Sequence, residues 1–300
     1  MKKTGVLVLC ISFAACFGSH KIQRLEVKHF DKEGHRGCRG LMPENTIPAM
    51  LKAIDLGVTT LETDAIITQD NKVILSHEPF FNHEIATKPD GSLVTEAEEK
   101  GLNIYHMNYE EVKKFDVGQR PHPRYPKQQK LAAVKPLLSD MIDAVEEYCK
   151  ANKKPLPNYN IETKSHAETD DQYHPKPAEF VELLIGVIKE KKIDHRIIIQ
   201  SFDPRTLQYL HAHYPEYKTA LLIEGTDKKA LALQLRDLGF IPAVYSPEHT
   251  LVTPLLVKQC RDAGISLLPW TVNTIERIRE LKKMGVNGVI SDYPDLFKDL

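Results

Sequence analysis

The chain has 300 residues, of which 42% are hydrophobic and 27% are charged. A chain of this length and composition buries a full apolar core as one large domain or two ordinary ones, which excludes small stapled scaffolds and disordered or fibrous chains. The 40 Lys and Arg residues balance 41 Asp and Glu residues, leaving a formal net charge of −1. This balance gives no electrostatic footprint for nucleic acid, so we expect no nucleic-acid partner.

Residues 1–18 have the pattern of a signal peptide. Two lysines precede an uncharged, mostly apolar run over residues 6–17, which is too short to span a bilayer as a mature helix. The run contains Phe-Ala-Ala-Cys, which resembles a bacterial lipobox with Cys16 as the lipidated residue. Ordinary cleavage near Gly18 is the alternative. In both cases we expect export, either to the periplasm or as a lipoprotein attached to a membrane through Cys16.

From residue 26 onward, short β-prone runs alternate with amphipathic runs of helical length, a pattern typical of parallel strands joined by crossover helices. The expected elements of the first half are a strand ending at His35, a helix over 47–56, strands over 61–66 and 72–76, and a strand ending at 161–164. Those of the second half are strands over 197–202, 219–223, 243–245, 267–272 and 289–290, and helices over 204–214, 227–238, 253–263 and 275–284. Asp203 is expected to cap the helix at 204–214.

Four helical runs end with a glycine followed by an apolar residue, at Gly57, Gly239, Gly264 and Gly285. Glycine supplies the left-handed residue just past a helix end, after which the chain turns directly into a strand. The repetition predicts a repeated αβ unit, and therefore a (β/α)8 barrel or a doubly wound sheet. No Gly-x-Gly-x-x-Gly opens a helix, so dinucleotide binding is not supported.

Length favours the barrel, because about 250 residues are typical of that fold and residues 26–300 fit it with one insertion. The insertion follows the third strand, at 79–138, where periodicity is weak. We expect it to shape the substrate site, and a decorative loop is the alternative. Nine strand candidates compete for eight places, and only 12 residues separate Asp64 from His77. This is barely enough for a crossover helix, so we expect a somewhat irregular barrel there.

Beyond the leader, Cys38, Cys149 and Cys260 stand at wide and irregular spacing. No Cys-x-x-Cys or Cys/His spacing typical of a metal site occurs among them. We therefore expect three buried, apolar cysteines rather than disulfides or metal ligands.

Charged residues fall at the expected carboxyl ends of the strands, where barrel active sites lie. Glu62 and Asp64 alternate along one strand and so point to the same side, as do Glu162 and Lys164 on another. Such pairs are costly in a packed interior unless they meet a cation or each other. If Glu62, Asp64 and Glu162 converge, they form an all-oxygen site that suits one divalent cation, Ca²⁺ or Mg²⁺.

Further residues near these strand ends suit phosphate chemistry. Arg36 and Lys164 supply positive charge for an anionic oxygen. His35 and His77 titrate near neutrality and can act as base and acid on opposite sides of a reacting phosphorus. Together with a divalent cation, these groups predict phosphodiester cleavage.

A series of sequence blocks carries these residues in a fixed order from residue 35 to residue 294. They are His-Arg-Gly at 35–37, Pro-Glu-Asn-Thr at 43–46, Leu-Glu-Thr-Asp at 61–64, Val-Ile-Leu-Ser-His at 73–77, Asn-Ile-Glu-Thr-Lys at 160–164, Gln-Ser-Phe at 200–202, Trp-Thr-Val-Asn at 270–273 and Gly-Val-Ile-Ser-Asp-Tyr-Pro at 288–294. In these blocks the chain resembles the glycerophosphodiester phosphodiesterases of the phospholipase-C-like barrel superfamily.

The resemblance implies a role for each residue that matches a family motif: an acid–base pair (His35, His77), three metal ligands (Glu62, Asp64, Glu162) and two phosphate contacts (Arg36, Lys164). Phe202 and Trp270 resemble the family's aromatics at the barrel mouth and are expected to contact the substrate, with a core position as the alternative for Trp270. Glu78 stands where the family usually has Asp, and it can reorient the neighbouring histidine. We expect structural roles for Glu44, Asn45 and Thr46, with Asn45 or Thr46 capping the helix over 47–56. At Asp292 we expect a loop cap, with a position facing the site as the alternative.

The implied reaction hydrolyses a small glycerophosphodiester to sn-glycerol 3-phosphate and an alcohol. The nucleophile is either the glycerol 2-hydroxyl or water, and either histidine can be the first base. One alternative is a lysophospholipase-D-like or phospholipase activity on larger lipids, which a long apolar groove formed by 79–138 would favour. A surface protein that only binds phosphodiesters is less favoured, because no expected metal ligand or histidine is missing.

Overall fold

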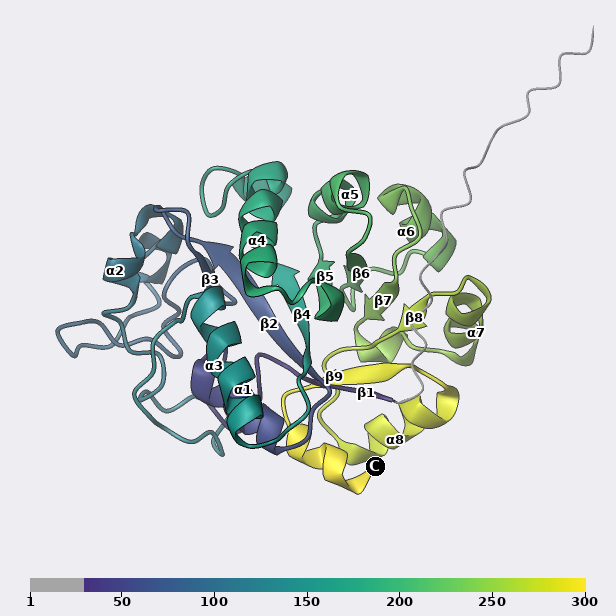
Figure 1. The fold of residues 1–300 in the computed structure, drawn as a ribbon, viewed down its shortest axis with the longest axis horizontal. Coiled ribbons are helices and arrows are strands. Elements are labelled where there is room, and N and C mark those ends of the chain that lie inside the picture. Colours follow the sequence, from purple (N-terminus) through teal and green to yellow (C-terminus); the bar gives the residue numbers. More distant parts are fainter. Residues whose placement is uncertain (1–29) are drawn as a thin grey trace, which may run out of the picture.

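The computed structural model describes residues 30–300, so the expected signal peptide at 1–18, with Cys16, lies outside the described residues. Helices surround a central ring of strands (Figure 1). The strands are β1 (Asp31–Gly34), β2 (Thr60–Ile67), β3 (Val73–Leu75), β4 (Asn158–Thr163), β5 (Ile197–Ser201), β6 (Lys218–Ile223), β7 (Val244–Pro247), β8 (Ser266–Leu267) and β9 (Gly288–Ser291). The helices are α1 (Ile47–Asp55), α2 (Tyr109–Val112), α3 (Leu138–Ala151), α4 (Pro177–Lys191), α5 (Pro204–His213), α6 (Leu231–Leu238), α7 (Pro254–Asp262) and α8 (Ile275–Met284).

Eight parallel strands lie in the order β8-β7-β6-β5-β4-β2-β1-β9. Hydrogen bonds from Ile290 N to Pro269 O (3.0 Å) and from Val272 N to Ile290 O (2.9 Å) bring β9 beside the chain that follows β8, so the ring nearly closes. The predicted (β/α)8 barrel is confirmed. The strand expected over 267–272 is shorter, since regular pairing with β7 ends at Leu267, although Leu268 N and Trp270 N still donate to Tyr245 O and Pro247 O at 3.0 and 3.1 Å.

The expected irregularity lies at β3, which pairs antiparallel with β2 and stays outside the ring. A tight turn joins the two strands, closed by a hydrogen bond from Thr68 N to Lys72 O (3.0 Å), with Asn71 at a φ of 57°. An antiparallel hairpin needs only a short connection, whereas a parallel crossover needs a helix. This explains how nine strands are accommodated around eight barrel positions.

The segment 79–138 is ordered by an apolar cluster that it shares with the β2–β3 hairpin. Its buried members are Ile66, Ile74, Phe81, Ile85, Ala86, Val94, Ile104, Val112, Phe115 and Val117. The rings of Phe81 and Phe115 stack with their centroids 3.8 Å apart. The segment contains only short helical pieces, namely Glu99–Gly101, Ile104–His106 and α2, which is why its sequence shows little periodicity. Figure 1 shows α2 and β3 to one side of the ring.

The predicted helix ends agree with the structure to within one residue, except that the helix expected over 227–238 begins only at Leu231. Asp203 caps α5 by accepting a hydrogen bond from Arg205 N, and Thr46 caps α1 by accepting one from Ala49 N. The four glycines expected past helix ends all have positive φ, between 73° and 97°. In an L-residue with a Cβ this conformation is strained, so glycine allows each chain segment to turn directly toward the next strand.

The main core lies between the ring and its helices, and it includes the expected cysteines. Cys38, Cys149 and Cys260 are buried and free, as predicted. Over residues 30–300, no helix combines the length and apolarity that crossing a membrane requires.

Candidate active site

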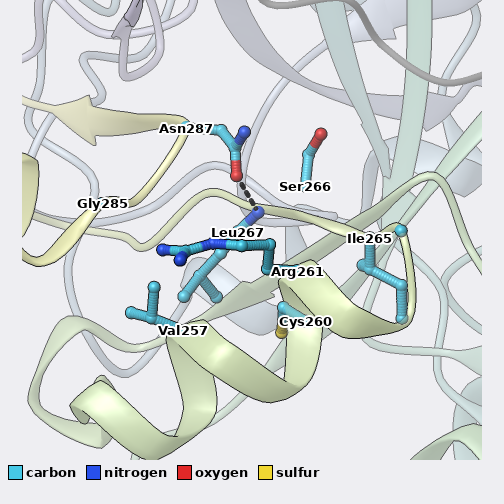
Figure 2. A pocket seen from close by; sticks show the side chains of 9 residues that line it. Val257, Cys260, Arg261, Ile265, Ser266, Leu267, Gly285 and Asn287 are labelled. Atoms are coloured by element: carbon cyan, nitrogen blue, oxygen red, sulfur yellow. Dashed lines mark hydrogen bonds between the residues drawn. The ribbon is translucent and has the colours of Figure 1, made fainter.

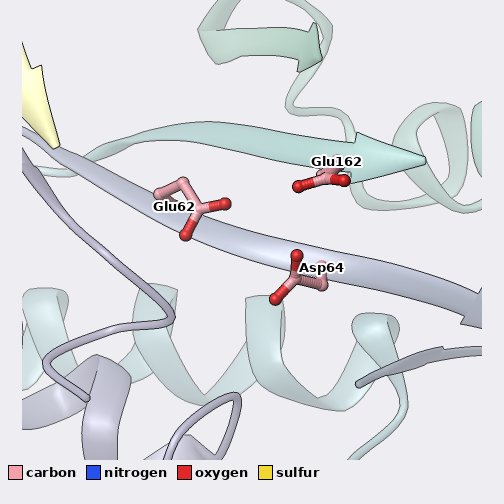
Figure 3. Close-up of side chains that lie close together, drawn as sticks. All are labelled: Glu62, Asp64 and Glu162. Atoms are coloured by element: carbon pink, nitrogen blue, oxygen red, sulfur yellow. The ribbon is translucent and has the colours of Figure 1, made fainter. Parts of the chain in front are cut away.

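Three buried carboxylates meet where the middle of β2 lies beside the carboxyl end of β4. Asp64 pairs in register with Glu162 across the two strands, and Glu62 lies two residues before Asp64 on the same face of β2. One oxygen of each side chain lies within 4.8 Å of the others. Figure 3 shows the three carboxylates turned toward a common space. The structure therefore brings together the three expected metal ligands.

This cluster has the chemistry of a hard-cation site. Burial, reinforced by Asp64, raises the pKa of Glu62 well above its usual range. Burial also raises the pKa of Glu162 to about 7, although Lys164 opposes this shift. Asp64 Oδ1 is buried without a hydrogen-bond partner. Three oxygen donors, two of them reluctant to ionise and one unsatisfied, fit a divalent cation that would favour their charged forms.

Arg36 and Lys164 face the same carboxylates. Arg36 Nε lies 3.2 Å from Asp64 Oδ2, and its NH1 donates to Glu44 Oε1 at 2.8 Å. Lys164 Nζ donates to Glu162 Oε1 at 2.8 Å and lies 3.7 Å from Asp64 Oδ1. Burial opposes the ionisation of Asp64, but Arg36 and His77 outweigh it and hold the pKa of Asp64 well below its usual value. Both expected phosphate contacts are thus cations at the cluster.

His35 follows β1 and contacts a second carboxylate behind it. Its Nδ1 lies 2.6 Å from Asp292 Oδ1, and its Nε2 lies 3.9 Å from Glu62 Oε2. Burial, together with Arg39, lowers the pKa of His35 to about 4, against the opposing effect of Asp292. The loop cap favoured for Asp292 is wrong and the alternative, a position facing the site, is correct, because β9 pairs with β1 and brings this carboxylate to the imidazole.

His77 follows β3 and is held by its neighbour. Its Nδ1 lies 2.6 Å from Glu78 Oε1, so Glu78 does orient His77. Burial and Lys164 lower the pKa of His77. Each histidine therefore has its Nδ1 on a carboxylate, which leaves Nε2 as the ring nitrogen for a substrate.

A pocket of about 310 Å³ at the barrel mouth unites these groups. Both histidines, Arg36, Glu62, Glu162 and Lys164 line it, and Phe202 and Trp270 form part of its wall. The two aromatic rings meet edge to face with centroids 5.4 Å apart. Trp270 Nε1 also donates to Ser246 O at 2.9 Å, so its ring both packs on the barrel and borders the pocket.

The model of the "Glycerophosphoryl diester phosphodiesterase family" matches residues 35–296. The chain belongs to this family. It is similar to the glycerophosphodiester phosphodiesterase of Caldanaerobacter subterraneus subsp. tengcongensis, with 27% identity over 89% of this chain and 95% of the relative. It is likewise similar to a glycerophosphodiester phosphodiesterase of Bacillus subtilis, with 28% identity over 88% of this chain and 83% of the relative.

A solved structure supports the fold assignment. The phosphodiesterase of Oleispira antarctica, in complex with the product sn-glycerol-3-phosphate, is 20% identical and has a TM-score of 0.69. The match covers 90% of this chain and 95% of the other. The family and the fold place this chain among phosphodiesterase enzymes.

Two residues of this phosphodiesterase-family chain orient the carboxylates and were not expected to do so. Asn45 Nδ2 donates to Asp64 Oδ2 at 2.8 Å, and Gln200 Nε2 donates to Glu62 Oε1 at 2.8 Å. Of the two residues expected as possible caps of α1, Asn45 and Thr46, Thr46 takes that role. Both residues lie in the sequence blocks that resemble the family, at 43–46 and 200–202. Their position in these blocks was the one sequence feature that could have indicated a place in the site.

A further pocket of the phosphodiesterase, of about 360 Å³, lies where α7 ends and β8 and β9 begin, which is the opposite end of the barrel. Figure 2 shows the side chains that line it. Val257 and Cys260 of α7, Leu267 of β8 and Asn287 line it, and Asn287 Oδ1 accepts a hydrogen bond from Leu267 N at 2.8 Å. Of its lining residues only Arg261 is charged. This pocket therefore lacks the paired acids and bases found at the mouth.

Proposed function

We propose that the protein hydrolyses small glycerophosphodiesters to sn-glycerol 3-phosphate and an alcohol. The observation that carries this proposal is the single pocket in which two carboxylate-held imidazoles face a cluster of three acids. Glu62, Asp64 and Glu162 would hold one divalent cation, Ca²⁺ or Mg²⁺. When bound, such an ion withdraws charge from phosphate oxygens.

The protein's own side chains bind the phosphate and transfer the protons. Arg36 and Lys164 bind the phosphate oxygens, as a fork and as a point charge respectively. One histidine accepts a proton from the attacking hydroxyl at Nε2, and the other gives a proton to the leaving oxygen. Because burial lowers the pKa of both imidazoles, either can act as the neutral first base. The other then enters the reaction as the imidazolium, whose Nε2 proton goes to the leaving oxygen and whose charge the adjacent carboxylate, Asp292 or Glu78, favours.

Single-residue variants test the acid–base pair. We expect His35→Ala and His77→Ala each to abolish turnover of glycerophosphocholine while circular dichroism stays unchanged. His195→Ala is the matched control, because His195 lies in a turn just before β5, at the other end of the barrel. A rate near that of the wild type for either site variant would refute the pair.

Cation removal tests the metal site separately. We expect excess chelator to abolish activity and either Mg²⁺ or Ca²⁺ to restore it, since buried acids need a counter-ion to bind an anionic substrate. Glu62→Gln should lower both the activity and its dependence on the cation. Full activity of the wild type in excess chelator would contradict a cation-dependent reaction.

We also propose that the chain is exported and lipidated at Cys16, on the strength of the leader pattern in residues 1–18. Expressed in a bacterium with radiolabelled palmitate, the wild type should carry label in the membrane fraction. Cys16→Ser should lose the label and become soluble. Label retained by Cys16→Ser would exclude this attachment.

A further inference from the structure

A second compartment adjoins the pocket of about 310 Å³ at the barrel mouth, which we call the catalytic pocket. It has a volume of about 460 Å³ and shares with the catalytic pocket a wall formed by His77, Glu162, Lys164, Phe202 and Glu224. We propose that this compartment binds the leaving alcohol of the diester and selects an alcohol that carries a quaternary ammonium group. The inference rests on the proposed function and specifies its substrate class.

The position of the compartment follows the geometry of an in-line displacement. The attacking and leaving oxygens lie on opposite sides of the phosphorus in such a reaction. His35 lines only the catalytic pocket, whereas His77 lines both spaces. A diester whose phosphate sits at the shared wall therefore extends one half toward His35 and the other half past His77 into the second compartment.

Aromatic rings from three separate parts of the chain line this compartment. Phe80 comes from the segment 79–138, Tyr173 from the connection between β4 and α4, and Phe202 from the end of β5. The Phe80 and Tyr173 rings meet edge to face with centroids 6.2 Å apart. A quaternary ammonium group has no N–H to donate, so aromatic rings rather than hydrogen-bond acceptors recognise it.

The charges of the lining suit a cation. Glu78 and Glu162 are paired with His77 and Lys164, at 2.6 Å and 2.8 Å. Glu224 is exposed and has no ion pair among the residues of the described chain, so its carboxylate is available to a ligand. Lys164 offsets the charge of Glu162, which leaves Glu78 and Glu224. Lys100 is also exposed on the lining, and it offsets the charge of only one of these two carboxylates.

The other half of the substrate, on the His35 side, finds polar surroundings. Arg39 and Gln200 line the catalytic pocket there. Arg39 Nε donates to the same Asp292 Oδ1 that His35 contacts, and Gln200 Nε2 donates to Glu62 Oε1. Glycerol hydroxyls need hydrogen-bond donors and acceptors, which these side chains offer. The aromatic compartment is thus left for the alcohol.

A pair of isosteric substrates isolates the charge of the alcohol. Glycerophosphocholine and glycerophospho-3,3-dimethylbutanol differ only in the replacement of the quaternary nitrogen by carbon. We expect the wild type to favour the choline diester by about tenfold in kcat/KM, the size of a well-formed cation–π contact with a nearby carboxylate. Phe80→Leu, Tyr173→Leu and Glu224→Gln should each bring this ratio toward one.

The substrate ratio is unaffected by a general loss of folded enzyme, because both diesters are turned over by the same preparation. Phe240→Leu serves as the matched aromatic control, since Phe240 follows α6 at the opposite end of the barrel, and it should keep the wild-type ratio. Lysophosphatidylcholine is assayed with the two diesters to test whether the compartment binds an acyl chain instead of the alcohol.

Three outcomes would overturn the inference. Equal kcat/KM for the two diesters would show that the compartment does not read charge, while leaving the proposed hydrolysis intact. Faster turnover of lysophosphatidylcholine than of glycerophosphocholine, lost in Phe80→Leu, would assign the compartment to an acyl chain. Absence of turnover of every glycerophosphodiester would remove the proposed function and this inference with it.

Discussion

At the scale of single residues, Asp292 organises one side of the site. Its Oδ1 lies 2.6 Å from His35 Nδ1, and its Oδ2 accepts hydrogen bonds from Tyr125 Oη at 3.1 Å and Asn273 Nδ2 at 2.8 Å. Burial opposes the ionisation of Asp292, but His35 and Arg39 outweigh it and hold the pKa of Asp292 well below its usual value. A charged carboxylate therefore fixes the imidazole and leaves Nε2 for the substrate.

Asp292→Asn tests this positioning role. The amide keeps the shape but loses the charge that orients the imidazole, so we expect kcat to fall by about 10²-fold, the lower end of what an acid–base group contributes. KM should change little, because Asp292 does not line the catalytic pocket. Steady-state kinetics measure both quantities, with Asp299→Asn near the C-terminus as control. An unchanged kcat would contradict the role.

Glu33 is a second buried acid inside the barrel, and it is connected to the site. It accepts a hydrogen bond from Asn160 Nδ2 at 2.9 Å, and Asn160 Nδ2 also donates to Gln200, which in turn donates to Glu62. Glu33 Oε1 and Asn160 Oδ1 are both buried without partners. Burial, reinforced by Asp31, raises the pKa of Glu33 well above its ordinary value. A protonated Glu33 suits these surroundings.

The raised pKa makes a prediction about stability. The folded chain holds the Glu33 proton to a higher pH than the unfolded chain, so the free energy of unfolding falls as pH rises above about 4.3, the unfolded value. Glu33→Gln keeps the shape without the titration. We expect it to be more stable than the wild type at pH 7, by on the order of 1 kcal/mol, and to lose this advantage near pH 4. Urea unfolding at both pH values is the measurement, and a pH-independent difference would contradict it.

At the scale of elements, the β2–β3 hairpin and the segment 79–138 act as one unit. Lys135 Nζ is buried and donates to Ser76 Oγ at 2.6 Å, directly before His77. Burial lowers the pKa of Lys135 to about 8. Phe81 is fully buried in the apolar cluster beneath this contact. The packing of the segment therefore supports both the loop that carries His77 and the compartment lined by Phe80.

Phe81→Ala should loosen this unit selectively. Removal of a buried ring costs about 3 kcal/mol or more, and the loss falls on a small cluster separate from the main core. We expect faster hydrogen exchange in 79–117 and lower activity. Phe180→Ala in α4 is the matched control, because Phe180 is equally buried but belongs to the main core. Equal exchange rates in 79–117 for the two variants would refute a selective effect.

At the scale of the whole molecule, the barrel assembles the site from strands that are distant in the chain. β1, β2 and β4 are neighbours in the ring, and β9 completes it beside β1. The three acids are therefore forced together by the sheet itself. Their mutual repulsion is a cost that a bound divalent cation relieves in the folded state only.

Cation binding should therefore stabilise the whole fold. At a cation concentration about a hundredfold above Kd, the expected gain is about 2.7 kcal/mol, which corresponds to a rise in Tm of roughly 5 °C for a chain of this size. Differential scanning fluorimetry with Mg²⁺ or Ca²⁺, against NaCl of equal ionic strength, measures it. Asp64→Asn should lose most of the shift, and a shift retained in that variant would place the cation elsewhere.

The sequence alone determined the alternation of strands and helices, the helix caps and the strand-end residues such as Glu62, Asp64 and Glu162. These features depend on neighbours a few positions apart, because the periodicity of a strand or a helix end is a local property. The sequence blocks that resemble the family then indicated which other residues, such as His35 and His77, share the site with these acids. Within the segment 79–138 this local signal failed, because its short turns are held by packing against the hairpin rather than by periodicity.

Only the tertiary structure decided which strand lies beside which, and so which side chains meet. The contact of Asp292 with His35 spans 257 positions and exists because β9 pairs with β1. The contact of Asn45 with Asp64 spans 19 positions and depends on how the first loop folds over β2. The hairpin at β3 and the compartment lined by Phe80, Tyr173 and Phe202 likewise come from ring closure and packing. Contacts between distant segments leave no periodic trace in the chain, because their energy comes from the whole assembled barrel.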